Sequence, residues 1–241
     1  MTTTAHASRP QPLLVFAGRW LGLRPSPPAP LPLWLSLVWA FVGAFAGLAV
    51  LQAVFGQSEH FTRQHVPPIV ASYGASAVLC FGVIESPLAQ PRALLGGHLI
   101  SAVVGIVVAI AFRITGLRDE DPTPRLSWLA SSLATAVALV LMLATKTTHP
   151  PAGATALLPI TSPPINRLGW YLLPVVLLSS SLLMAVAMLT NNIQRRYPLF
   201  WWSPPRPEKP GPPPELPKAP DEPGRRPPGD DVEKQGEAES S

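Results

Sequence analysis

The chain has 241 residues, 47% of them hydrophobic and only 13% charged, with a mean hydropathy of +0.27. A soluble domain carries about 25% charged residues, so this composition excludes an ordinary soluble protein and indicates a membrane protein. The formal net charge is +4, but the basic residues flank apolar segments as membrane-edge anchors do, and we expect no nucleic-acid partner. The single cysteine, Cys80, excludes an intrachain disulfide and a cysteine-built metal site, and we expect it to be a small buried hydrophobe.

The composition divides the chain into a proline-rich arm (1–32), a transmembrane domain (33–198) and a charged, proline-rich tail (199–241). We expect both ends to be disordered, because residues 203–241 alone hold 12 prolines, 6 basic and 9 acidic residues and few apolar ones. The arm shows no cleavable signal-peptide pattern, and an interfacial helix or a weak organelle-targeting segment remains an alternative for it.

Four apolar segments are long enough to cross a lipid bilayer as helices, since about 20 residues suffice. They are residues 32–58, 93–112, 126–145 and 168–194. His98 lies near the start of the second, and we interpret it as an anchor. Gly43 and Gly47 form a GxxxG pattern on the first, which indicates close helix packing within the monomer or in a homo-oligomer.

Two further apolar segments, 66–84 and 150–160, are interrupted by proline and glycine. The second has only 11 residues, about 16 Å of helix, and does not span a bilayer alone. The two segments resemble each other, because GASAVL at 74–79 matches GATALL at 153–158. We interpret this as an internal repeat with halves at about 33–113 and 126–194. Matching interrupted segments in two halves are typical of a transport site.

The number of membrane crossings follows from whether the short segments cross. If both are re-entrant, eight basic residues lie on one side (Arg9, Arg19, Arg24, Arg113, Arg118, Arg125, Arg195, Arg196) and four on the other (Arg63, Arg92, Lys146, Arg167). If both cross, the bias is seven to five. The positive-inside rule therefore favours four crossings, with five or six as alternatives.

The polar residues around the short segments indicate a site for a small anion. Pro67-Pro68 and Pro150-Pro151 are predicted helix starts, where free N–H groups and the helix dipole favour negative charge. Gly74 and Gly153 are predicted to allow close packing beside the site. The candidate substrate-binding residues are Lys146, Thr147, Thr148, His149, Thr155, His65, Ser76 and Arg92.

Three of these residues also have a purely structural interpretation. Lys146 at a helix end is able to snorkel to the membrane surface, and His149 and His65 are ordinary turn residues in that interpretation. We expect no enzyme, metal or cofactor, because hydrolase, metalloprotease and nucleotide-binding motifs are lacking from the sequence.

The stretch THPPAGATALL around His149-Pro150-Pro151 resembles the HPP family of integral membrane proteins, as does GASAVLCFGVIESPLAQPRALLGGHLISAVVG at 74–105. The resemblance covers roughly residues 33–195, and the proline-flanked ends and RRYPLFWW look like the fungal branch. It implies four membrane spans and, because members in plastids and cyanobacteria are implicated in nitrite transport, a transporter of a small inorganic anion. The alternative is a membrane scaffold whose tail binds polyproline-recognising partners.

Overall fold

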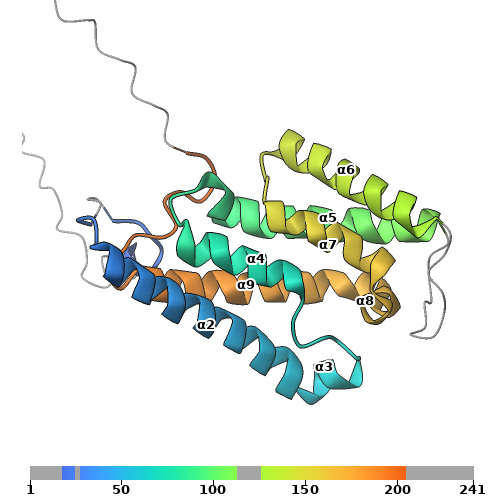
Figure 1. Cartoon of the computed structure of the whole chain (residues 1–241), viewed down its shortest axis with the longest axis horizontal. Helices are drawn as coiled ribbons and strands as arrows, with labels where there is room; N and C mark the ends of the chain where they lie inside the picture. The colour runs from blue at the N-terminus through green and yellow to red at the C-terminus, as the bar shows by residue number, and fades with distance from the viewer. Residues whose placement is uncertain (1–17, 25–27, 113–125, 205–241) are drawn as a thin grey trace, which may run out of the picture. The chain divides into compact units, whose positions relative to one another are not determined.

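The computed structural model describes residues 18–24, 28–112 and 126–204, and the regular secondary structure in these ranges is helical (Figure 1). The helices are α2 (Leu33–Gln57), α3 (Glu59–Arg63), α4 (Ala71–Ala77), α5 (Pro91–Ala111), α6 (Ser127–Thr145), α7 (Pro150–Thr161), α8 (Pro163–Leu168) and α9 (Leu172–Asn191). A π-helical turn, η1 (Val78–Gly82), continues α4, while the 3-10 turns η2 (Pro87–Ala89) and η3 (Gly169–Tyr171) precede α5 and α9. The predicted all-α membrane bundle is confirmed. Of the predicted arm (1–32) and tail (199–241), residues 1–17, 25–27 and 205–241 lie outside the described residues.

Four helical stretches in the described ranges are long and apolar enough to cross a membrane, as predicted. They are Leu33–Gln57, Pro91–Ala111, Ser127–Thr145 and Pro163–Asn191, the last formed by α8, η3 and α9. In lipid each backbone N–H needs an acceptor within the protein, and a long apolar segment meets that need by becoming a helix.

One end of the bundle, here called the terminal end, gathers the starts of α2 and α5 and the ends of η1, α6 and α9. Arg195, just after α9, donates to the carbonyls of Ser36 in α2 at 3.2 Å and Phe81 in η1 at 3.3 Å. Arg92 at the start of α5 donates to the Thr145 carbonyl at the end of α6 at 2.5 Å. These contacts place the five helix ends on one side of the bundle.

The opposite end, here called the loop end, holds the end of α2 and the start of α9. There the His60 Nε2 lies 2.9 Å from the Tyr171 hydroxyl. Because α2 finishes at the loop end and η1 finishes at the terminal end, the chain through α4 runs from one end to the other. By the same reasoning, α7 leads from the end of α6 back to the loop end.

The path of the chain therefore follows the six-crossing alternative and not the favoured count of four. Each is a full passage made of an extended stretch and a short helix. Before α4, the extended residues 66–70 add up to about 16 Å to roughly 18 Å of helix, which together match a hydrocarbon core of about 30 Å. Before α7, the non-helical residues 147–149 add up to about 10 Å to roughly 18 Å of helix. The basic residues are then distributed seven to five, the weaker of the two charge biases.

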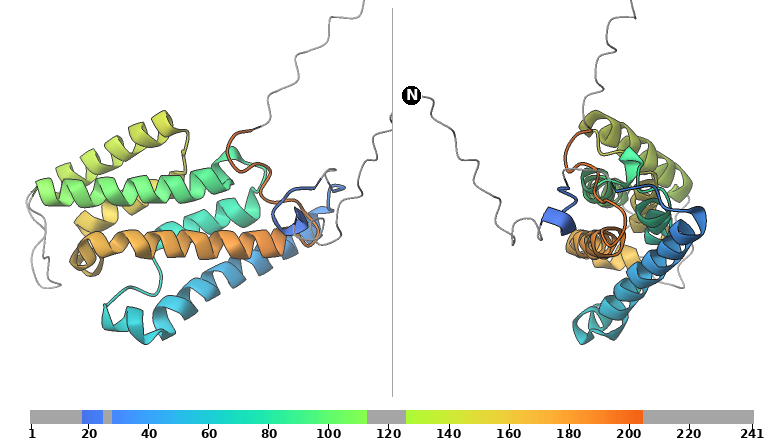
Figure 2. Two further views of the ribbon diagram at one scale, coloured as in Figure 1. Left: turned by 180° about the vertical axis from the view of Figure 1, so that it is seen from behind. Right: turned by 90° about the vertical axis from the view of Figure 1, so that its left-hand side faces the viewer.

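The two predicted halves run in opposite directions across the bundle. Each consists of a long helix, an interrupted passage and a second long helix: α2, α4 and α5 in the first, α6, α7 and α9 in the second. Since three passages are an odd number, the second half begins at the end opposite to the first. Figures 1 and 2 show the two short helices in the middle of the bundle, one after the other along its length, with their starts overlapping.

Helix α5 lies at the centre, and α2 lies at the outside. Of the most apolar window of α5, 61% is buried, against 17% for α2, whose exposed Trp34, Phe41 and Phe45 are suited to lipid. Helix α6 turns a buried stripe of alanines toward α5 and α7. The stripe consists of Ala130, Ala134 and Ala138, all with no exposed surface. Small residues at four-residue spacing let the helix backbones approach closely.

Glycines on the long helices seat the two short passages. A Cβ at Gly105 of α5 would lie 2.5 Å from the carbonyl oxygen of Ala156, so α7 rests directly on α5. On α2, a Cβ at Gly43 would meet the Phe81 ring, as would one at Gly47. The structure thus shows the intramolecular role for the GxxxG pair of α2.

The close-packing role predicted for Gly74 and Gly153 is not what the structure shows. A Cβ at Gly74 would meet no atom within 4 Å, and one at Gly153 would meet only the Thr135 methyl at 3.9 Å. The glycines that allow close packing lie instead on the neighbouring long helices, at the points where the short helices contact them.

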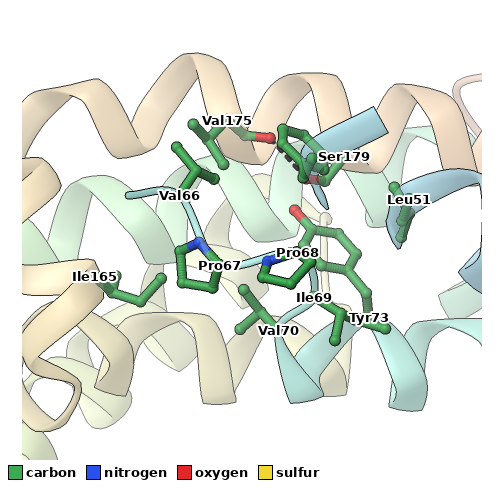
Figure 3. A pocket seen from close by; sticks show the side chains of 11 residues that line it. Leu51, Val66, Pro67, Pro68, Ile69, Val70, Tyr73, Ile165, Val175 and Ser179 are labelled. Carbon is green, nitrogen blue, oxygen red and sulfur yellow. Dashed lines mark hydrogen bonds between the residues drawn. The ribbon is translucent and has the colours of Figure 1, made fainter. Parts of the chain in front are cut away.

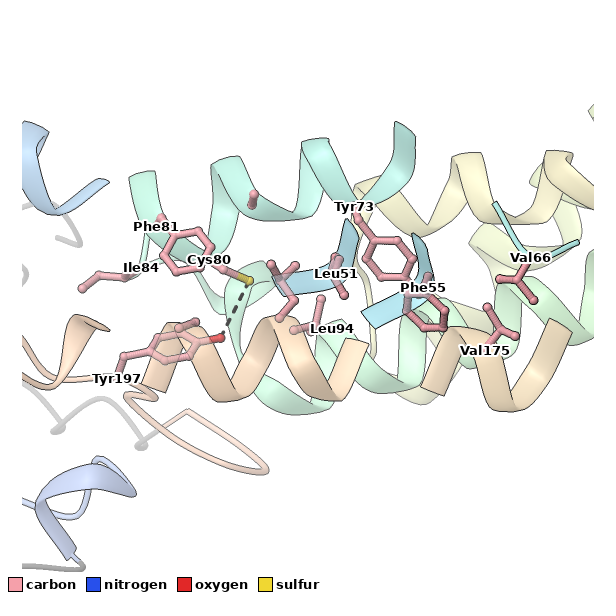
Figure 4. Packing of buried hydrophobic residues seen from close by; sticks show 13 residues of the cluster. Leu51, Phe55, Val66, Tyr73, Cys80, Phe81, Ile84, Leu94, Val175 and Tyr197 are labelled. Carbon is pink, nitrogen blue, oxygen red and sulfur yellow. Dashed lines mark hydrogen bonds between the residues drawn. The ribbon is translucent and has the colours of Figure 1, made fainter. Parts of the chain in front are cut away.

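The segment that follows α9 packs against the terminal end of the bundle. Tyr197 has no exposed surface, and its hydroxyl donates to the Ala89 carbonyl at 2.5 Å and lies 3.9 Å from the Cys80 sulfur (Figure 4). Burial raises the pKa of the Tyr197 hydroxyl well above its ordinary value, so the group stays a donor. The Leu199 amide donates to Gln90, and Cys80 is buried as predicted.

Candidate functional site

A buried polar cluster lies where α4 and α7 overlap beside α5. Ser72 and Ser76 come from α4, Thr155 from α7, His98 from α5, and His149 is the residue that precedes the first turn of α7. All five are at most 2% exposed. Polar side chains this deep in an apolar bundle are costly and are kept where they are paired or functional.

Ser76 joins the two histidines. Its hydroxyl oxygen lies 2.9 Å from Nε2 of His98 and 2.8 Å from Nε2 of His149. The two rings are 5.0 Å apart between centroids. The other nitrogen of His149, Nδ1, lies 2.8 Å from the carbonyl oxygen of Leu88, so it must carry the proton of that hydrogen bond.

His98 is held on its other side by Thr155. The hydroxyl of Thr155 lies 2.8 Å from Nδ1 of His98 and 3.2 Å from the hydroxyl of Ser72. The ring of Tyr73 stacks on His98 with centroids 4.8 Å apart. Every ring nitrogen of both histidines therefore has a partner.

Tyr73 links the cluster to α9. Its hydroxyl donates to the Val176 carbonyl at 2.9 Å and lies 3.3 Å from the Ser180 hydroxyl. The same side chain lines a cavity of about 10 Å³ beneath Pro67 and Pro68 (Figure 3). A cavity of that size holds about one water molecule.

Ser76 and Thr155 occupy the same place in the two copies of the repeat, since GASAVL and GATALL align them. Each makes a hydrogen bond to a different nitrogen of His98. The two copies of the repeat therefore hydrogen-bond the two nitrogens of one imidazole ring. His98 thus lies where the inverted halves meet.

A cationic pocket of about 330 Å³ opens at the terminal end, close to this cluster. Arg92, Lys146 and Thr148 line it, together with Leu88 and the ring of Trp202. The Arg92 guanidinium stacks on that ring at 4.4 Å. Leu88 belongs to both features, because it lines the pocket and its carbonyl accepts a hydrogen bond from Nδ1 of His149.

Comparison with known proteins identifies the family. The chain matches the family description "HPP, transmembrane region" over residues 29–198. The chain belongs to the HPP transmembrane family. Two transmembrane proteins of Dictyostelium discoideum are similar to it, at 35% identity over 193 residues and 38% over 167 residues. These matches cover 79% and 68% of the chain but 64% and 50% of the relatives, so the chain spans only part of their length. No solved structure matches it.

Family membership and the four apolar helices make this HPP protein a multi-pass integral membrane protein. Both relatives come from a slime mould, so the resemblance of the ends to the fungal branch gains no support from them.

The HPP structure divides the predicted site residues among three places. Ser76, His149 and Thr155 lie in the buried cluster. Arg92, Lys146 and Thr148 lie at the terminal-end pocket, and His65 lies exposed at the loop end. Thr147 lies between the first two places, with its hydroxyl 2.8 Å from that of Thr145 and its methyl against Gly96.

Two backbone predictions have different outcomes. Pro150 and Pro151 do occupy the first positions of α7, as the HPP motif predicts. Pro67 and Pro68 do not start α4, which begins three residues later at Ala71. They lie in the extended stretch before it, because the first passage has four more residues between its prolines and its glycine.

Sequence patterns alone do not identify the central residue, His98, or its neighbours Tyr73 and Ser72 as part of the site. His98 was interpreted as an anchor because it follows Gly96 and Gly97 near the start of a span. The available signal was an ionisable residue inside an apolar helix, which marks a functional position by default. Within the described residues no group of three or more His, Cys, Asp or Glu side chains is arranged to hold a metal ion.

Proposed function

We propose that this HPP protein transports a small inorganic anion, nitrite first, along a path between its two inverted halves. The path runs from the terminal-end pocket to the buried histidine and hydroxyl cluster. The proposal assigns no catalytic step, metal or cofactor to the chain.

The observation that carries the proposal is the connection between the pocket and the cluster. Leu88 lines the pocket, and its carbonyl accepts a hydrogen bond from His149. A solute that leaves the pocket toward the bundle centre therefore meets the start of α7 first. Discontinuous passages in inverted halves, with a polar site between them, are the arrangement on which alternating access operates in several transporter folds.

The charge at the pocket favours an anion. Arg92 and Lys146 both line it, and its described lining contains no acidic side chain. A second pocket at the terminal end, of about 420 Å³, is lined by Arg195 and Arg196 with Glu85. Clefts lined mainly by one sign of charge concentrate ions of the opposite sign.

The cluster offers the donors that a small anion needs. Imidazole N–H groups and the hydroxyls of Ser76 and Thr155 donate hydrogen bonds to the oxygen atoms of an anion. Because these donors carry no permanent positive charge, the anion is released easily. These groups have almost no exposed surface in this conformation. Substrate entry therefore requires the two halves to move apart at Ser76, whose hydroxyl joins both.

Nitrite uptake into proteoliposomes carrying the purified full chain tests the proposal, with equal pH on both sides. We expect uptake above that of empty liposomes, reduced about threefold to tenfold by Arg92→Ala or Lys146→Ala, because steering by charge acts on entry. Arg63→Ala is the matched control. It removes an arginine at the loop end that is paired with Glu59 at 2.7 Å, and uptake should be unchanged.

Uptake equal to that of empty liposomes, with the protein shown to be folded and inserted, would reject nitrite as the substrate. Deletion of residues 205–241 separates transport from the scaffold alternative. A transporter keeps its uptake without the tail, whereas a scaffold has no uptake to lose.

A further inference from the structure

The hydrogen bonds of the cluster form one continuous line from α4 to the terminal end. The line runs through Ser72, Thr155, His98, Ser76 and His149, with heavy-atom distances between 2.8 and 3.2 Å, and it ends on the Leu88 carbonyl. Each step joins groups that both donate and accept protons. The positions of the protons follow from counting donors.

The count starts at His149. Its Nδ1 faces a carbonyl and must carry a proton, so in the neutral ring Nε2 is an acceptor. The hydroxyl of Ser76 has one proton and two acceptors within reach, Nε2 of His149 and the Ser72 carbonyl at 3.0 Å. In the arrangement that satisfies His149, the proton points to His149. The oxygen of Ser76 then accepts from His98, whose Nε2 carries a proton.

Two states of His98 satisfy this arrangement. If the ring is neutral, Nδ1 accepts from the Thr155 hydroxyl, and the Ser72 hydroxyl in turn donates to Thr155. If Thr155 instead donates to Ser72, Nδ1 must carry a second proton and the ring is a cation. The two states differ by one proton on His98 and by the rotation of two hydroxyls, with no change in heavy-atom positions.

The geometry points to a proton relay through His98, Ser76 and His149, by which the protein moves protons together with its substrate. This inference rests on the proposed function only for the identity of that substrate. The relay itself is a property of the cluster.

Each end of the line is separated by one residue from a cavity that can hold water. Ser72 is adjacent in sequence to Tyr73, which lines the small cavity under Pro67 and Pro68 (Figure 3). At the other end, His149 is bonded to Leu88, which lines the terminal-end pocket. The line therefore crosses the segment of the bundle where the two halves meet.

The transfer balances with one proton entering and one leaving. A proton binds Nδ1 of His98 as the Thr155 hydroxyl turns away from the ring. His98 gives its Nε2 proton to the oxygen of Ser76, while Ser76 gives its own proton to Nε2 of His149. The His149 cation then releases its Nδ1 proton beside Leu88. The hydroxyls turn back, and both His98 and His149 exchange tautomer to reset the line.

The described groups that surround the two histidine rings carry no negative charge that could pair with a protonated His98. Tyr73 of α4 stacks on His98, His149 approaches from α7, and Ser101 of α5 lies one turn away against Met142 of α6. On the side of α9, Ser180 contacts the Tyr73 hydroxyl. Within the described ranges, no Lys, Arg, Asp or Glu is hydrogen-bonded or ion-paired to either ring. A proton on His98 therefore lacks a resident counter-charge, which an anion would supply.

Proteoliposomes that contain an internal pH dye test the relay, with nitrite and proton entry recorded separately. The external pH is set about one unit below the internal pH, and empty liposomes correct for nitrous acid that crosses the lipid. At one proton per anion we expect about tenfold accumulation of nitrite. A second recording uses a potassium-valinomycin potential to drive protons with and without nitrite.

The variants separate relay from fold. His98→Gln keeps a donor and an acceptor but takes no second proton, and Ser76→Ala removes the bridge; both should abolish accumulation and dye acidification. Ser76→Thr copies the residue at the equivalent place in the second half and should retain both signals. Ser101→Ala is the matched control, a buried α5 serine outside the line that should behave as the wild type.

The outcomes distinguish the relay from the proposed function. Nitrite uptake without proton entry, and without response to the pH gradient, overturns the relay and keeps the transporter. Proton entry that depends on His98, without nitrite uptake, supports the relay and rejects nitrite. Wild-type protein that moves no protons in either recording overturns the relay, as does a fully active His98→Gln.

Discussion

The α4 passage and the α7 passage have similar sequences but begin in different ways. Helix α7 starts at Pro150, directly after a histidine that has no exposed surface and belongs to the polar cluster. Helix α4 starts at Ala71, after Val70, and is continued by a π-helical turn. Their later parts converge again, since Ser76 and Thr155 both bond His98. The comparison shows that the repeat preserved the hydroxyls and diverged at the helix starts.

The two proline pairs have different physical roles. Pro150 and Pro151 occupy helix positions whose N–H groups would have no partner within the helix. Pro67 and Pro68 lie in a non-helical stretch, the first half-buried and the second exposed, where ordinary residues would present N–H groups that no helix satisfies. The same residue type thus removes unsatisfied donors in both passages, but at a helix start in one and in irregular chain in the other.

The largest effect is expected where a passage rests on backbone. Gly105→Ala places a Cβ 2.5 Å from the Ala156 carbonyl, which cannot rotate away, whereas at Gly43 the obstacle is the Phe81 side chain. We expect Gly105→Ala to destabilise the protein by about 3 kcal/mol, and Gly43→Ala by less. Thermal unfolding in detergent measures both. Equal losses of stability in the two variants would mean that the backbone contact at Gly105 and the side-chain contact at Gly43 are equally restrictive.

The next effect concerns the bridge between the histidines. Ser76→Ala leaves a donor on one ring and an acceptor on the other without a partner, at a cost of about 1–3 kcal/mol. Thr155→Ser keeps its hydroxyl and should cost less than Ser76→Ala. The same unfolding measurement ranks the two. A larger loss for Thr155→Ser would show that packing of its methyl group, and not the hydrogen bonds, holds the site together.

The prolines give a smaller, directional difference. Pro67→Ala adds an N–H group to the extended stretch and should cost about 1–3 kcal/mol if the donor finds no partner. Pro150→Ala mainly frees the unfolded chain and should cost about 0.4–1 kcal/mol. Denaturant titration of the two variants beside the wild type checks the order. The reverse order would mean that Pro150 of the HPP motif contributes more to stability than Pro67.

The smallest effect has the opposite sign. Gly74→Ala and Gly153→Ala both fit without close contact, and alanine favours a helix interior by about 0.5–1 kcal/mol over glycine. We therefore expect slight stabilisation in both passages. Marked destabilisation of either variant, seen as a lower unfolding temperature, would restore a packing role for that glycine.

The sequence by itself determined the class of the protein, its four long helices and the positions of the two interrupted segments. These features follow from apolar length and from proline and glycine placement, which are local properties of the chain. It also marked His149, Ser76 and Thr155, since the repeat brings their segments to equivalent places. The helix start at Pro150 was predictable for the same reason.

Only the tertiary structure decided that both short segments cross the bundle and that His98 lies at the centre of the site. A span is counted from its helical length, and non-helical residues such as 147–149 escape that count. The partners of His98 come from α4, α5 and α7, which lie far apart along the chain, so no local pattern places them together. Lys146 and Arg92 lie at the pocket instead, because the positive-φ turn at Lys146 ends α6 at the bundle surface, before the chain enters the core.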